Sequence, residues 1–135
     1  LRALEDAGLR VVALFGVYGA ARDDYIARSR IVLNLHYYEG RLFEMVRVSY
    51  LLANGCCVVS ETGDDPEAER AYEGAVAFTS YDGIVPTCLE LLRDDARRRA
   101  LGANGLALMQ SRHQADALRA AIGQMPGGFA GLGAG

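Results

Sequence analysis

The residues best suited to chemistry lie close together in the stretch LNLHYYEGRLFE, Leu33 to Glu44. Between Leu33 and Leu42, its polar and aromatic residues are Asn34, His36, Tyr37, Tyr38, Glu39 and Arg41. A tyrosine pair offers stacking faces for a base or a sugar, a histidine can donate to phosphate, and a carboxylate can accept from a sugar diol. The stretch therefore predicts a ligand site. The alternative, in which the tyrosines are packing residues and His36 is a satisfied polar residue at a sheet edge, stays open.

Glu44 and Arg47 follow directly and, three residues apart, share one face of a predicted helix. One interpretation is a surface ion pair near a helix N-terminus, worth only about 1 kcal/mol. The apolar residues that follow are Met45, Val46, Val48, Tyr50, Leu51 and Leu52. They leave little of the helix for water, so the two charges need a polar partner. A nucleotide at this helix end would be one.

Two other loops are weaker candidates. Gly16 and Gly19 have G-x-x-G spacing, which is also typical of plain turn glycines. Ser60 and Thr62 could bind phosphate, but the acidic residues of the segment 61–67 oppose this, and acid-rich loops usually face solvent.

Short aliphatic runs alternate with helical segments along the chain. Strands are predicted at 10–15, 31–35, 57–60 and 75–78. Helices are predicted at 22–28, 42–54, 67–72, 83–92, 95–109 and 115–125, with Gly55 as the left-handed cap after the second. This alternation predicts an α/β, Rossmann-like fold with a mostly parallel sheet of about four or more strands flanked by helices. Ligands bind beyond the carboxyl ends of such strands, where the loop 33–44 begins.

Composition narrows the classes of function. The 135 residues suit one domain, 51% hydrophobic and 23% charged, and no run is long enough to cross a bilayer. A net charge of −3 gives no positive field for nucleic acid. The three cysteines include the adjacent pair Cys56 and Cys57, which point to opposite faces of a strand, so reduced thiols are expected rather than a disulfide. No spacing of metal ligands is present, and neither a metal nor a cofactor is expected.

The ends of the chain indicate a piece of a longer protein. The sequence opens at Leu1 without an initiator methionine, and four strands are few for a free-standing domain of this class. We expect residues 1–125 to form one domain and the glycine-rich residues 126–135 to be a disordered tail.

Three segments carry a family resemblance: RDDYIARSRIVLNLHYYE, LFEMVRVSYLLANGCCVVSE and AVAFTSYDGIVPTCLELLRDDARRRALGANG. From about Arg22 to Met109 they resemble the carboxyl-terminal, nucleotide-sugar-binding domain of GT-B fold glycosyltransferases of the group 1 or family 4 type. The order of strand, Asn-x-His, helix with Phe-Glu-x-x-Arg, Ala-Asn-Gly turn and strand carries the likeness.

The resemblance implies a hexosyltransferase-like enzyme of polysaccharide or other glycan synthesis, with a UDP- or GDP-sugar as donor. Glu44 would bind the ribose hydroxyls, with Glu39 as the second choice, and Arg47 and His36 would contact the diphosphate or the transferred sugar. Tyr37 and Phe43 are the remaining expected donor contacts. The acceptor would be held by an amino-terminal domain. Such enzymes work in the cytoplasm, some at the inner face of the membrane, and the isolated piece would bind donor but transfer nothing.

One departure from the family pattern concerns catalysis. Many retaining members carry two glutamates at a fixed spacing, but the position so spaced after Glu39 is Arg47, and after Glu44 it is Leu52. The sequence therefore assigns no catalytic base and no stereochemical course. A DxD pair for a metal is absent too, in agreement with the usual GT-B pattern.

A different class of function stays open beside the enzyme. A degenerate transferase-like domain could mediate protein contacts, with Glu44 and Arg47 a purely structural pair. A receiver-type regulatory domain is disfavoured, because Asn34 stands where its strand-end aspartate would fall.

Overall fold

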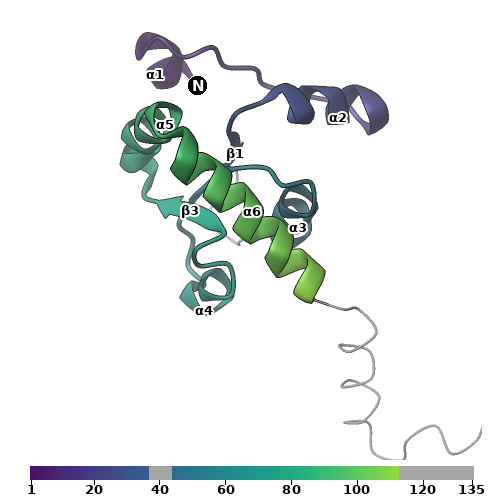
Figure 1. Cartoon of the computed structure of the whole chain (residues 1–135). Helices are drawn as coiled ribbons and strands as arrows, with labels where there is room; N and C mark the ends of the chain where they lie inside the picture. Colours follow the sequence, from purple (N-terminus) through teal and green to yellow (C-terminus); the bar gives the residue numbers. More distant parts are fainter. Residues whose placement is uncertain (37–43, 113–135) are drawn as a thin grey trace, which may run out of the picture.

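Three short parallel strands form the sheet in the computed structural model, which describes residues 1–36 and 44–112. The strands are β1 (Val32–Asn34), β2 (Val58–Glu61) and β3 (Val76–Thr79), in the spatial order β1-β2-β3. Val32, Val58 and Val76 are register partners across the sheet. The predicted α/β class with a parallel sheet flanked by helices is therefore confirmed, with fewer strands among these residues than expected (Figure 1).

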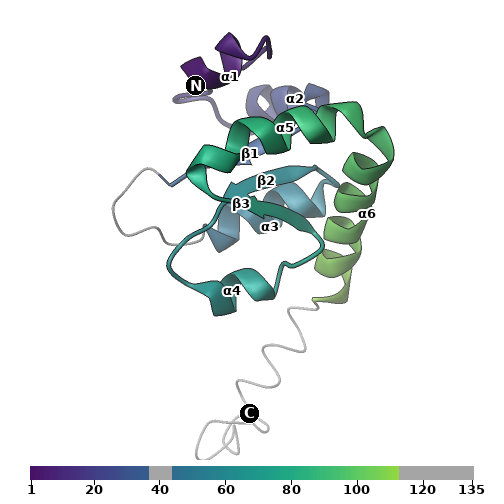
Figure 2. The same ribbon diagram turned by 90° about the vertical axis from the view of Figure 1, so that its left-hand side faces the viewer.

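Helices cover both faces of the sheet. They are α1 (Arg2–Asp6), α2 (Gly19–Arg28), α3 (Met45–Ala53), α4 (Pro66–Arg70), α5 (Ile84–Arg93) and α6 (Asp95–Ser111), with a 3-10 turn, η1 (Tyr81–Gly83), before α5. Figure 2 shows α5 on one side of the strands, α3 on the other, and α6 beside them. The predicted helix at 115–125 lies outside the described residues.

Alternation along the strands divides the core in two. On the α3 face, the buried core residues are Val48, Leu51, Leu52, Val58, Tyr72, Ala75 and Val76. On the α5 face they are Leu4, Cys57, Val59, Ile84, Cys88, Leu91 and Leu101. Neighbouring strand residues thus pack into opposite clusters, as expected for strands covered on both faces.

The turn from α3 into β2 was predicted correctly. Gly55 has a φ of 69°, its N–H donates to Leu52 O (2.9 Å), and the N–H of Cys56 donates to Leu51 O (3.1 Å). This pair of bonds is a Schellman cap, which needs a left-handed residue that glycine adopts without strain. The cap directs the chain back into the sheet.

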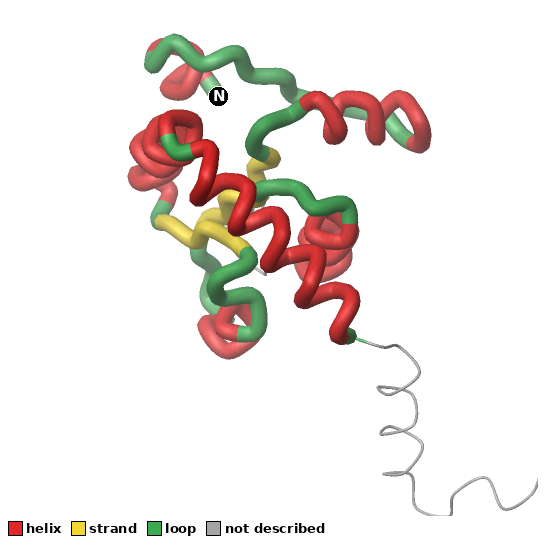
Figure 3. The backbone as a smooth tube through the Cα atoms, viewed as in Figure 1, coloured by secondary structure: helices red, strands yellow, loops and turns green. Residues whose placement is uncertain are grey.

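The predicted strand at 10–15 is wrong. Figure 3 draws the whole connection between α1 and α2 as loop, and none of the backbone hydrogen bonds of the described residues joins this run to β1. Leu9 and Val11 pack against the α5-face cluster, whereas Val12 and Phe15 are 57% and 83% exposed. The run supplies apolar contacts on one side only and leaves the edge of β1 unpaired within the described part of the chain.

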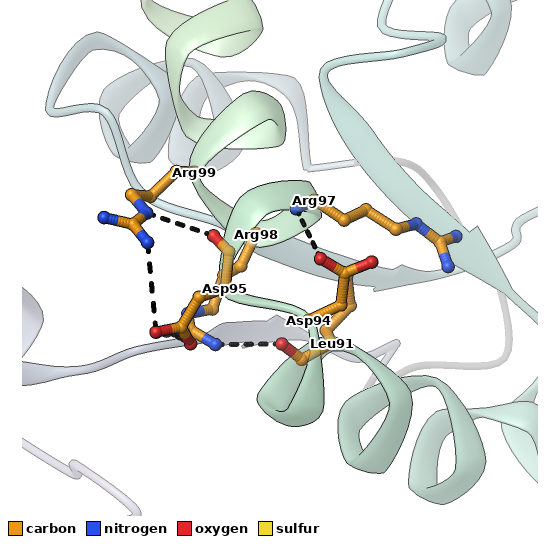
Figure 4. Close-up of polar contacts among 6 residues, drawn as sticks. All are labelled: Leu91, Asp94, Asp95, Arg97, Arg98 and Arg99. Atoms are coloured by element: carbon orange, nitrogen blue, oxygen red, sulfur yellow. Dashed lines mark hydrogen bonds and ion pairs between the residues drawn. The ribbon is translucent and has the colours of Figure 1, made fainter.

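The arginine-rich segment at the α5–α6 corner is part of the scaffold. Asp94 caps α6 by accepting from Arg97 N (2.8 Å), and Arg98 reaches the carbonyl oxygen of Leu91 (2.9 Å) and the carboxylate of Asp95 (Figure 4). The side chains of Arg97 and Arg99 are 46% and 79% exposed, whereas that of Arg98 is only 13% exposed. These arginines fix a helix corner.

The three cysteines are free, and Cys57 and Cys88 are buried. Over residues 1–36 and 44–112, no helix combines the length and the apolar character that a membrane crossing requires.

Candidate functional site

The carboxyl ends of β1 and β2 bring polar side chains from distant parts of the chain together. Asn34 ends β1, Ser60 and Glu61 end β2, and His36 follows β1 by two residues. Asn34 and Ser60 are register partners in the parallel ladder, so their side chains leave the same face of the sheet. The ligand edge expected of this class of fold is therefore rich in hydrogen-bonding groups.

A buried hydrogen-bond chain runs along this edge. The side-chain amide of Asn34 donates to Ser60 Oγ (3.1 Å), and Ser60 Oγ donates to the carbonyl oxygen of Glu61 (3.1 Å). Asn34 and Ser60 are both fully buried. Oδ1 of Asn34 is the one buried side-chain polar atom, among the described residues, that finds no partner. Ser60 is thus part of the scaffold, because its buried hydroxyl is engaged by protein groups on both sides.

His36 and Glu61 contact each other twice. The backbone N–H of His36 donates to Oε2 of Glu61 (3.2 Å), and Nε2 of the His36 ring lies 3.0 Å from the carbonyl oxygen of Glu61. Glu61 is 6% exposed, whereas His36 is only partly buried. The acid-rich segment 61–67 predicted a solvent-facing loop, and its pattern gave no sign of this role of Glu61. Two polar residues at matching ends of aliphatic strands, Asn34 and Ser60, were the signal that the two segments meet.

Glu44 and Arg47 lie at the start of α3, where they were predicted. Nη1 of Arg47 is 3.3 Å from Oε2 of Glu44, and Nη2 of Arg47 makes a long contact of 3.4 Å to the carbonyl oxygen of Leu33. Glu44 is the residue before the first turn of α3, but its side chain makes no capping hydrogen bond. Arg47 therefore joins the helix start to the end of β1.

Helix α3 is covered on one stripe only, so the prediction that little of it faces water is wrong. Only Val48, Leu51 and Leu52 are buried, because their spacing places them on one stripe of the helix. Val46 is 88% exposed. The side chains of Glu44 and Arg47 are 45% and 54% exposed, so both reach solvent and neither needs a ligand to satisfy its charge.

The acidic loop after β2 is organised by its own acids. Asp65 caps α4 by accepting from Ala68 N (3.0 Å), and the Glu69 carboxylate accepts from the backbone N–H of Gly63. The N–H of Thr62 donates to Thr79 O (2.8 Å), which extends the pairing of β2 with β3. The backbone N–H groups of Thr62, Gly63 and Ala68 are thus engaged within the protein.

Three of the predicted donor contacts, Tyr37, Glu39 and Phe43, lie outside the described residues. Of the other three, the structure brings Arg47 and Glu44 into contact, and Arg47 also reaches the end of the strand that leads to His36.

A shallow hollow of about 580 Å³ lies elsewhere, against α5 and the start of α6. Its lining residues are Pro86, Leu89, Glu90, Arg93, Asp94 and Asp95. Asp94 and Asp95 there bind neighbouring backbone and arginine groups, so this hollow is a helix corner and not the strand-end site. In residues 1–36 and 44–112, histidine, cysteine and acidic side chains form no group of three or more that could hold a metal ion.

Fold and strand ends together define an α/β domain with polar side chains at the carboxyl ends of β1 and β2. Comparison with protein families gives the class: a family model described as glycosyl transferase-like matches residues 5–122, and the chain belongs to that family. Comparisons with curated proteins and with solved structures return no match.

Proposed function

We propose that this chain is the donor-binding domain of a GT-B glycosyltransferase and holds a nucleoside-diphosphate sugar beyond the carboxyl ends of β1 and β2. Two contacts near that edge support the proposal in a chain of a glycosyl transferase-like family: His36 binds Glu61 beyond the strand ends, and Arg47 reaches the carbonyl oxygen of Leu33 in β1. The expected transfer breaks the bond between sugar and diphosphate and forms one to an acceptor hydroxyl. The acceptor would be held by an amino-terminal domain.

The roles follow from charge and position. Arg47 is a half-exposed guanidinium with five donors, suited to the two phosphate groups. Glu44 is an exposed carboxylate on the same helix face and can accept from the ribose diol. Their mutual contact of 3.3 Å is long for a charge-assisted bond, so a ligand can replace it at little cost. Glu39, Tyr37 and Phe43 stay further donor contacts of the same loop in this proposal.

Ligand-dependent stability tests the proposal. Binding to the folded state alone raises the melting temperature by mass action, so uridine or guanosine diphosphate, or their sugar conjugates, should raise Tm at millimolar concentration. Glu44→Ala and Arg47→Ala should abolish the shift with little change in Tm of the free protein. No shift with any of these ligands would count against donor binding.

The chain offers a matched control for these variants. Asp24 and Arg28 form an exposed ion pair on α2 with side chains 62% and 65% exposed. Arg28→Ala removes the same kind of charge pair away from the strand ends. It should leave the nucleotide-dependent rise in Tm intact.

A second candidate function has its own support. Glu44 and Arg47 already contact each other, and apolar side chains such as Phe15 and Val46 are exposed. A degenerate transferase-like module that binds another protein would show both features. It predicts flat nucleotide titrations in the whole panel of ligands.

A further inference from the structure

Asn34 and His36 are linked through Ser60 and the carbonyl oxygen of Glu61. The direction of each hydrogen bond in this chain follows from the chemistry of the groups. A backbone carbonyl oxygen only accepts, so both Ser60 Oγ and Nε2 of His36 must donate to the oxygen of Glu61. Ser60 has a single hydroxyl hydrogen, which this bond uses. Ser60 Oγ therefore accepts from Asn34, which places the amide nitrogen of Asn34 toward Ser60 and leaves Oδ1 as the orphan.

The same logic fixes the His36 ring. Because Nε2 carries the hydrogen, Nδ1 of the neutral ring is a hydrogen-bond acceptor. No described residue is paired with Nδ1, and the ring is only partly buried. His36 thus presents an acceptor at the edge of the sheet.

Glu61 holds this arrangement from two sides. Its carboxylate accepts from the backbone N–H of His36, and its carbonyl oxygen accepts from the ring. Glu61 itself is fixed by the strand pairing of β2 with β3 and by near-complete burial. A side chain fixed in this way keeps a ring orientation that a free histidine would not keep.

We propose that Glu61 is a positioning residue that holds His36 so that Nδ1 accepts a hydrogen bond from a hydroxyl of the ligand. In the tautomer that the carbonyl oxygen of Glu61 selects, Nδ1 carries no hydrogen to donate to a phosphate oxygen, so the diphosphate is left to Arg47. The inference rests on the proposed function, since it names which chemical group of the donor His36 binds. The hydroxyl belongs either to the ribose or to the transferred sugar.

Nitrogen NMR of the histidine rings in the full chain tests the arrangement directly. The chain has two histidines, so a His113→Gln variant assigns the His36 signals. In the free protein with a singly protonated ring, we expect the hydrogen on Nε2, protected from exchange with water, and none on Nδ1. A ring with its hydrogen on Nδ1, or an Nε2 hydrogen that exchanges as in a free peptide, overturns the proposal.

Titration with three probes then identifies the group bound. Inorganic pyrophosphate should leave the Nδ1 signal unchanged. A shift with uridine or guanosine diphosphate assigns the ribose hydroxyls, and a shift with the sugar conjugate alone assigns the transferred sugar. Protonation of Nδ1 by pyrophosphate overturns the inference while donor binding stands, whereas no binding of any nucleotide or conjugate rejects the proposed function itself.

Two variants of Glu61 separate positioning from general folding. Glu61→Gln keeps an oxygen that can accept from the His36 N–H, and we expect it to retain the Nε2 signal and near-normal affinity. Glu61→Ala removes that acceptor and should weaken binding of the nucleotide sugar about tenfold, the effect of one lost hydrogen bond. If Glu61→Ala folds and changes neither the His36 signals nor affinity, Glu61 does not position His36. If it does not fold, loss of the His36 Nε2 signal in folded Glu61→Gln overturns the proposal.

Discussion

Gly102 of α6 lies against the carbonyl oxygen of Gly55, so close that a Cβ on Gly102 would be 2.4 Å from that oxygen. The contact joins the middle of the last helix to the turn that leads into β2. Since Gly55 O is backbone and is held by the cap of α3, it cannot move aside cheaply. The contact fixes how β2 enters the sheet and hence where its polar carboxyl end lies.

Gly102→Ala should therefore destabilise the protein by about 1–3 kcal/mol from overpacking, although alanine is the better helix former. Denaturant unfolding measures the change. Gly105→Ala is the comparison, because the atoms nearest to its Cβ would be side-chain atoms of Leu52, with Cδ2 at 2.6 Å, and not backbone atoms. We expect a smaller loss there, and equal stability of Gly102→Ala and the wild type would contradict the close contact.

The Glu44–Arg47 pair should contribute little to stability. Both side chains are about half exposed, and exposed pairs couple by less than about 1 kcal/mol. A double-mutant cycle of Glu44→Ala and Arg47→Ala in denaturant unfolding measures this coupling. The same cycle on Asp24 and Arg28 gives the reference value for an exposed pair. A coupling of several kcal/mol at Glu44 and Arg47 alone would favour the structural role over donor binding.

Features of the fold that are determined by a few neighbouring residues could be predicted from the sequence, whereas features that depend on a distant partner could not. The three strands around 31–35, 57–60 and 75–78 and the cap at Gly55 were predictable, because a short β-branched run and a left-handed glycine act within a few residues. The run at 10–15 has the same composition, but a strand also needs a partner, and pairing is not visible in a local pattern.

The site shows the same limit. The loop after β1 was identified because its residue types are unusual together, and His36 does lie at the carboxyl edge. Its contact with Glu61 depends on the register of β1 against β2, residues 25 apart in sequence, and no spacing rule predicts it. The exposure of Val46 was missed because an apolar run of this length fits a half-covered helix as well as a buried one.

The contact between α2 and α3 should show in acid. Tyr50 OH donates to Asp23 Oδ1 (2.8 Å), and the Arg22 guanidinium also donates to that carboxylate. The Tyr50 hydrogen bond first, and then that of Arg22, lower the pKa of Asp23 below its ordinary value of 3.8. A lowered pKa means that the contribution to stability is present above the ordinary value and is lost as the pH falls through the folded value. The free energy of unfolding, measured as the pH is lowered below about 4, should therefore fall less steeply for Tyr50→Phe than for the wild type. An equal dependence on pH in the two proteins would mean that the contact does not form.

At alkaline pH, the buried thiol of Cys57 should make the free energy of unfolding fall as the pH rises. Burial between β2, α5 and α6 raises the pKa of its thiol from 9.0 to about 11. The unfolded thiol releases its proton first, so the stabilisation is complete below pH 9.0 and is lost as the pH rises toward 11. The full loss is about 1–3 kcal/mol. Across this pH interval, the free energy of unfolding should fall less steeply for Cys57→Ala than for the wild type. The cavity left by the substitution lowers stability at every pH, so it does not affect a comparison of slopes. Cys56→Ala is the control: Cys56 is less buried, so its removal should change the slope less, and an equal effect of both variants would contradict the burial of Cys57.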